Sequence, residues 1–223
     1  MWRRELLGSM GIVVLAPAKA LPLSETDAAS GVRAALERGA LAAVAALGRS
    51  GGFMDNEQLR IPLPGALDKA ARLLKAAGQG RRVDELVTAM NRAAEQAVPA
   101  GRSVLVDAVK RLSVEDALQL VRARGDDAVT RFFETKTREA LSARFLPIVA
   151  LATDKQGLAE KYNAVASKAA GLGLLKGEDA SIQAYVTRKA LDGLFWQIGE
   201  EERRIRQDPV GTGSAILKRV FGR

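Results

Sequence analysis

No Cys and no His occur among the 223 residues of the chain, and this limits the chemistry that its side chains could perform. Zinc sites, iron–sulfur clusters, Ser-His-Asp triads and cysteine nucleophiles all lack their essential groups here. Acid–base chemistry from carboxylates and nucleophilic chemistry from Lys, Tyr, Ser or Thr stay open. The sequence therefore predicts no catalytic residue, no metal site and no cofactor, and it favours a protein that is not an enzyme.

Four side chains that could bind a ligand lie close together in residues 182–198. They are Tyr185, Arg188, Lys189 and Asp192. Arg188 and Asp192 are four residues apart, so they can form an ion pair on one face of a helix. We interpret this pair as structural, because a charge inside a protein is usually tolerated only when it is paired. A binding role for the four side chains is the alternative hypothesis.

Residues 48–64 form a second candidate, because they are the only long stretch without helical periodicity. A connection of 17 residues is longer than most loops without structure of their own, and such loops often bind something. The binding candidates in this stretch are Arg60, Ile61, Pro62, Leu63 and Pro64. We favour docking of the segment onto its own domain, because its apolar side chains would otherwise form a costly exposed patch.

A run of three glutamates near residue 200 is followed closely by arginines. Successive helical side chains point about 100° apart, so three neighbouring carboxylates cannot converge on one metal ion. Helical spacing instead predicts ion pairs at a solvated helix end. The pairs that this spacing allows are Glu200 with Arg203 or Arg204, Glu201 with Arg204, and Glu202 with Arg206.

The elements that position these residues are predicted to be helices. Apolar residues recur every three or four positions almost everywhere from Thr26 onward, and no long alternating strand pattern or repeat of 20–50 residues is present. The sequence predicts an all-α, single globular multi-helix domain over residues 21–223, with about eight to ten short helices. In residues 182–198 apolar side chains cover most of the circumference, which predicts a central buried helix near the C-terminus with Phe195 at its middle.

Residues 1–20 have the pattern of a cleavable export signal. Arg3 and Arg4 precede a short apolar stretch, and Ala18-Lys19-Ala20 has the small residues that signal peptidase requires. Paired arginines are typical of the twin-arginine route, and general secretion is the competing interpretation. An N-terminal core helix is a third interpretation. The sequence thus predicts a mature chain that begins at Leu21 and is periplasmic or secreted.

Export determines which partners the chain could meet. Removal of residues 1–20 lowers the formal charge from +8 to +6, so the mature chain stays basic. Outside the cytoplasm nucleic acid is not a favoured partner. We expect a protein partner or apolar ligand of the envelope, with anionic lipid or a cell-wall polymer as alternatives.

Five segments of the chain resemble the bacterial family known as domain of unknown function 4197. They are RIPLPG (60–65), VDELVTAMNRAAEQA (83–97), FLPIVALATDKQGLAEKYN (145–163), YVTRKALDGLF (185–195) and DPVGTGSAILKRVFG (208–222). The resemblance covers nearly the whole mature chain and implies an exported, helical, envelope-associated protein. Some members have a lipoprotein signal, but this chain lacks the Cys that lipid anchoring needs. The resemblance assigns no catalytic or ligand-binding residue.

These observations favour a non-catalytic binding or scaffold protein of the cell envelope that engages a protein partner or an apolar ligand. The alternative is a cell-wall or lipid-processing enzyme that uses a single carboxylate as general acid or base, because such chemistry needs no His. A basic protein that coats anionic surfaces is the third hypothesis.

Overall fold

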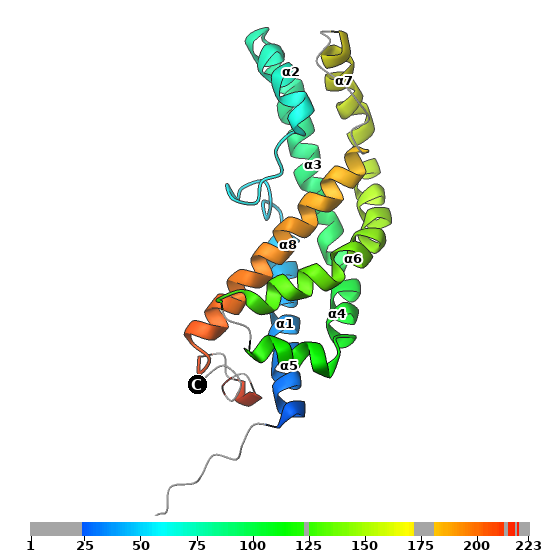
Figure 1. Ribbon diagram of the computed structural model, residues 1–223. Helices are drawn as coiled ribbons and strands as arrows, with labels where there is room; N and C mark the ends of the chain where they lie inside the picture. The colour runs from blue at the N-terminus through cyan, green and yellow to red at the C-terminus, as the bar shows by residue number, and fades with distance from the viewer. Residues whose placement is uncertain (1–23, 123–124, 172–180, 212–213, 217, 219–223) are drawn as a thin grey trace, which may run out of the picture.

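The computed structural model describes residues 24–122, 125–171, 181–211, 214–216 and 218, and within these residues the regular elements are helices (Figure 1). They are α1 (Glu25–Leu47), α2 (Gly65–Ala76), α3 (Gly80–Ala100), α4 (Arg102–Lys110), α5 (Val114–Arg122), α6 (Ala128–Lys155), α7 (Leu158–Gly171) and α8 (Ile182–Gln207). The prediction of an all-α single domain is confirmed. Not all helices are short, since α6 has 28 residues and α8 has 26. The predicted export signal lies outside the described residues.

Short polar side chains begin several helices, and glycines end them. The Ser24 hydroxyl accepts a hydrogen bond from the Asp27 amide at 3.0 Å at the start of α1, and Ser113 accepts from the Asp116 amide at 3.0 Å at the start of α5. Such caps satisfy amide groups that have no partner within the helix. Gly78 follows α2 with a φ of +75°, a conformation that side chains with a Cβ rarely adopt.

Helix α8 is the central helix that the sequence predicts. It crosses the molecule diagonally and packs most extensively against α1 and α6 (Figure 1). Its buried apolar residues are Ile182, Val186, Ala190, Leu191, Leu194, Phe195, Ile198 and Ile205. The Phe195 ring meets the ring of Phe133 from α6 edge to face, with 6.0 Å between centroids. The middle of α8 is therefore part of the main core.

The remaining helices are arranged along an elongated molecule. Helices α2 and α7 pack against each other and against α3 at one end, and α5 lies at the opposite end against α1 (Figure 1). Helix α4 packs between α1 and α6. This places α4 and the middle of α6 side by side at the surface.

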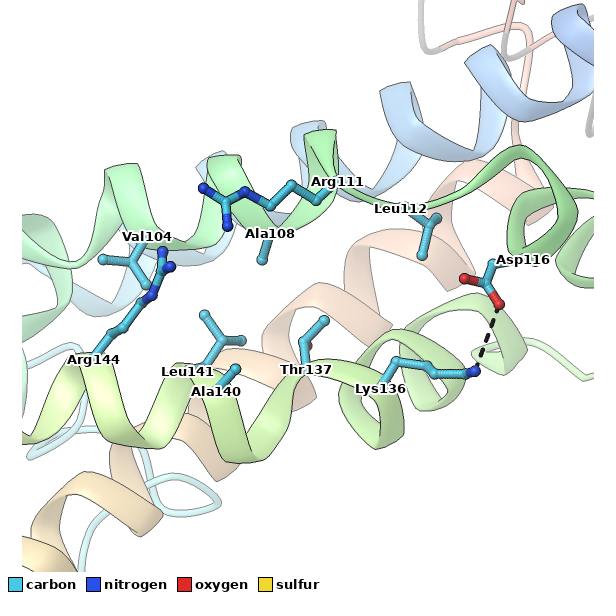
Figure 2. Close-up of a pocket in the computed structure, with 10 residues that line it drawn as sticks. All are labelled: Val104, Ala108, Arg111, Leu112, Asp116, Lys136, Thr137, Ala140, Leu141 and Arg144. Carbon is cyan, nitrogen blue, oxygen red and sulfur yellow. Dashed lines mark ion pairs between the residues drawn. The ribbon is translucent and has the colours of Figure 1, made fainter.

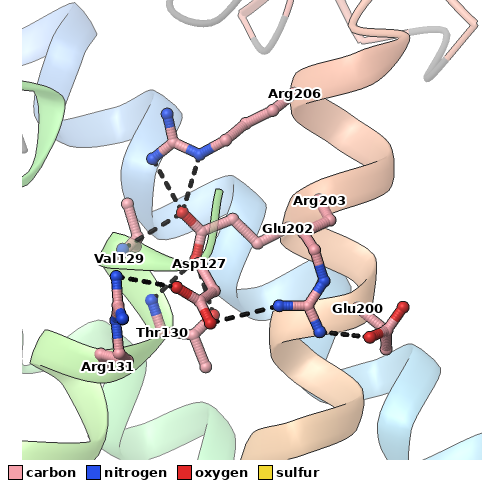
Figure 3. A network of polar contacts seen from close by, with 8 residues as sticks. All are labelled: Asp127, Val129, Thr130, Arg131, Glu200, Glu202, Arg203 and Arg206. Carbon is pink, nitrogen blue, oxygen red and sulfur yellow. Dashed lines mark hydrogen bonds and ion pairs between the residues drawn. The ribbon is translucent and has the colours of Figure 1, made fainter. Parts of the chain in front are cut away.

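The glutamate run at the end of α8 ties this helix to the start of α6 (Figure 3). One carboxylate oxygen of Glu202 accepts from the Val129 amide at 3.1 Å, and the other accepts from the Thr130 amide at 2.8 Å and the Thr130 hydroxyl at 2.7 Å. Arg206 donates two further hydrogen bonds, at 2.9 and 2.7 Å. Glu202 is only 4% exposed. It therefore caps the first turn of α6 from a distant part of the chain.

This arrangement corrects the prediction of a simple solvated helix end. The structure has the predicted ion pairs of Glu202 with Arg206 at 2.7 Å, of Glu201 with Arg204 at 3.4 Å, and of Glu200 with Arg203. Spacing along one helix could predict these local pairs. It could not reveal that α6 would present its unpaired amides to one of the three carboxylates.

Candidate functional site

Residues 48–64 dock onto helices α3 and α8. The buried side chain of Asn91 on α3 accepts from the Ile61 amide at 2.8 Å and donates to the Ile61 carbonyl at 3.0 Å. The Tyr185 hydroxyl on α8 donates to the Pro62 carbonyl at 2.9 Å. These hydrogen bonds satisfy backbone groups of Ile61 and Pro62, as a neighbouring β-strand would do.

The first half of the loop is held by a buried carboxylate. One oxygen of Glu95 on α3 accepts from the Phe53 amide at 3.2 Å and the Met54 amide at 3.0 Å. The Phe53 ring lies against Gly193 of α8, where an added Cβ would approach the ring to 2.7 Å. A larger residue at position 193 would therefore displace the loop. These contacts support docking of the segment onto its own domain.

The five candidates in this loop have different surroundings. Ile61 and Leu63 are buried in the core, and Pro64 is half-buried at the start of α2. Pro62 is exposed, and Arg60 is exposed while its Nε donates to the Met54 carbonyl at 2.7 Å. Only Arg60 and Pro62 present much surface to a partner.

The predicted pair of Arg188 with Asp192 is not the arrangement in the structure. Asp192 instead pairs with Arg138 of α6 at 2.8 Å and with Lys189 at 3.2 Å. The Arg188 guanidinium lies over the Tyr185 ring, 5.4 Å from its centroid. Arg138 lies on the facing helix and reaches the Asp192 carboxylate from there, so it takes the place that sequence spacing predicted for Arg188. Burial raises the pKa of the Tyr185 hydroxyl above its ordinary value, and the charge of Arg188 opposes this shift.

These side chains border two open depressions between α6 and α8. Arg188 lines the larger one, of about 640 Å³, and Asp192 lines the smaller one, of about 250 Å³. Glu134 and Arg138 pair with each other and line both depressions, and Asp192, which also pairs with Arg138, lines the smaller one. Tyr185 joins this region to the loop through its bond to Pro62. Neither depression is an enclosed cavity beside the central helix.

A third depression, which we call the α4–α6 groove, combines an apolar floor with charged ends (Figure 2). Its volume is about 290 Å³. The lining residues are Val104, Ala108, Arg111, Leu112 and Asp116 on one side, and Lys136, Thr137, Ala140, Leu141 and Arg144 of α6 on the other. Helix α4 and α6 run in opposite directions along it, with Val104 and Arg144 at one end and Asp116 and Lys136 at the other.

The polar groups beside the floor of the groove are already satisfied. The Thr137 hydroxyl donates to the Phe133 carbonyl at 2.6 Å within α6. The Leu112 carbonyl just beyond α4 accepts two hydrogen bonds from Arg33 of α1, at 3.1 and 2.6 Å. The middle of the groove therefore offers apolar surface and few groups that require a polar partner.

The two ends of the groove differ in charge. At one end Lys136 and Asp116 form an ion pair at 3.7 Å, so their charges largely cancel. At the other end the Arg111 side chain extends along α4 and the Arg144 side chain rises from α6 toward it (Figure 2). Neither guanidinium has an ion-pair partner among the described residues. This end of the groove is consequently positive.

Sequence reasoning did not single out any residue of the α4–α6 groove. Its two walls come from segments about 30 residues apart, and each wall alone is an ordinary amphipathic helix face. The small side chains Ala108 and Ala140 leave the space, and only the packing of α4 on α6 brings them together.

Other kinds of site find no support in the part of the chain that the structure describes. No group of three or more acidic side chains there could hold a metal ion. None of the helices described is long and apolar enough to cross a membrane.

Fold and grooves together define an all-helical protein with half-open surface grooves, one of them apolar and basic at one end. A family model described as "Protein of unknown function (DUF4197)" matches residues 22–222, so the chain belongs to this family. The family resemblance of the five sequence segments is thereby confirmed. No match to the chain was found among curated proteins or among solved structures.

Proposed function

We propose that the protein is a non-catalytic binding protein of the cell envelope, which holds a small, mainly apolar ligand in the α4–α6 groove. The observation that carries the proposal is the groove itself: an apolar floor whose neighbouring polar groups are satisfied, between two helices that the core holds in place. Its volume of about 290 Å³ is near the lower limit for small-molecule sites.

The carboxylates of the described chain favour binding over catalysis. Glu95 and Glu202 are buried, and both accept hydrogen bonds from backbone amides and arginines. Asp116 is the only carboxylate that lines the groove, and Lys136 pairs with it. The alternative of a single-carboxylate enzyme therefore has less support.

The envelope location in this proposal rests on the export pattern of residues 1–20. An apolar ligand suits this setting, because lipids and their breakdown products are abundant at membranes. The protein would then act as a carrier or sensor of such a ligand, with no chemical step of its own.

Binding of N-phenyl-1-naphthylamine, a neutral apolar fluorophore, tests the proposal. We expect its fluorescence to rise on binding to the protein, and Ala140→Trp to abolish the rise by filling the groove. Ala159→Trp is the matched control, because Ala159 is an exposed helical residue on α7 that does not line the groove. Circular dichroism checks that both variants are folded. Equal fluorescence for wild type and Ala140→Trp would contradict the proposal.

A further inference from the structure

The charge difference between the two ends of the α4–α6 groove indicates which chemical class it takes. We infer that the ligand is a medium-chain carboxylate, with its carboxylate at the Arg111 and Arg144 end and its hydrocarbon chain directed toward Leu112. This inference rests on the function proposed above and specifies the ligand of the same groove.

The first argument is the convergence of two guanidinium groups. Arg111 and Arg144 come from facing elements and point to the same end of the groove (Figure 2). No carboxylate of the described residues forms an ion pair with either of them. An anion bound between them is attracted by both guanidinium groups. A guanidinium also matches a carboxylate geometrically, with two parallel hydrogen bonds.

The two ends of the groove differ in what they offer to an anion. Arg111 and Arg144 make one end positive. The opposite end offers no comparable attraction, because the Lys136–Asp116 pair neutralises it. A ligand with one anionic head and an apolar tail fits this asymmetry.

The dimensions of the groove decide against larger occupants. The stretches from Val104 to Leu112 and from Lys136 to Arg144 each cover nine residues, so their ends are eight residue steps apart, or roughly 12 Å at the helical rise. This is close to the extended length of a medium-chain acid such as decanoate. A partner helix is about 10 Å across, and a stable protein interface needs about 800 Å² from each partner. The groove is too short to supply such an interface.

Isothermal titration calorimetry with decanoate and with decanol tests the inference. We expect decanoate to bind several-fold more tightly than decanol. Arg111→Gln and Arg144→Gln should each weaken decanoate binding about three- to fivefold and leave decanol binding unchanged. Lys110→Gln is the matched control, because it removes the same charge from α4 at an exposed position outside the groove. Added salt should weaken decanoate binding only.

The outcomes separate this inference from the function on which it rests. If decanoate and decanol bind equally and Ala140→Trp blocks both, the groove binds apolar ligands and the assignment of an anionic head is wrong. Equal weakening by Lys110→Gln and Arg144→Gln would also overturn the assignment, because it would show only a general charge effect. If neither ligand binds, or Ala140→Trp leaves binding intact, the proposed function itself fails.

Discussion

Replacement of Glu202 by Ala should destabilise the protein strongly, because this carboxylate joins the end of α8 to the start of α6. The change removes the acceptor for two backbone amides and one hydroxyl, those of Val129 and Thr130. It also removes the acceptor of two hydrogen bonds from Arg206. Both amides belong to buried residues, so water does not readily replace the lost acceptor.

The expected cost follows from these lost bonds. A buried donor left without a partner costs about 1–3 kcal/mol, and removal of one member of a buried ion pair costs about 3–5 kcal/mol. The effects overlap, so we expect Glu202→Ala to lower the free energy of unfolding by about 3–5 kcal/mol. Glu202→Gln keeps one acceptor oxygen, and we expect a loss of about 1–3 kcal/mol.

Urea unfolding followed by circular dichroism at 222 nm measures this free energy, provided that the slope with denaturant stays constant. The matched control is Glu201→Gln on the same helix. Its ion-pair partners Arg38 and Arg204 have side chains that are 43% and 70% exposed. We expect it to cost less than about 1 kcal/mol. The reasoning would be refuted if Glu202→Ala stayed within about 1 kcal/mol of wild type, or if Glu201→Gln cost as much.

Three further predictions concern the core, the loop and export. Phe195→Ala should lower the free energy of unfolding by about 3–5 kcal/mol, because the ring is 3% exposed and packs on Phe133. A loss below about 1 kcal/mol in the same urea assay would show that α8 is not central. Arg60→Ala should lower the free energy of unfolding by about 0.5–1 kcal/mol, because it removes the hydrogen bond to Met54. The proteins that a pull-down recovers from envelope extract should stay the same. Loss of partners with unchanged stability would make the loop a recognition site. Intact-mass measurement of protein from the native host should give a mature chain that begins at Leu21, and retention of residues 1–20 in a cytoplasmic product would contradict export.

The loop of residues 48–64 shows how far sequence reasoning could proceed. Its lack of periodicity marked it as irregular, and its apolar side chains indicated that it must be covered. The groups that cover it, Asn91, Glu95 and Tyr185, lie on helices far along the chain. A hydrogen bond to a backbone amide or carbonyl leaves no periodic pattern in the sequence, so these partners could not be predicted.

The sequence by itself determined the helical class, the central position of α8 and the absence of histidine and cysteine chemistry. These properties depend on residue types and on spacing within one segment, where the helical repeat alone places side chains on a common face. Tertiary structure alone decided that Asp192 pairs with Arg138, that Glu202 caps α6, and that Arg111 and Arg144 border the same end of a groove. The physical reason is that each of these contacts joins two packed elements, and their relative position follows from the burial of the whole core.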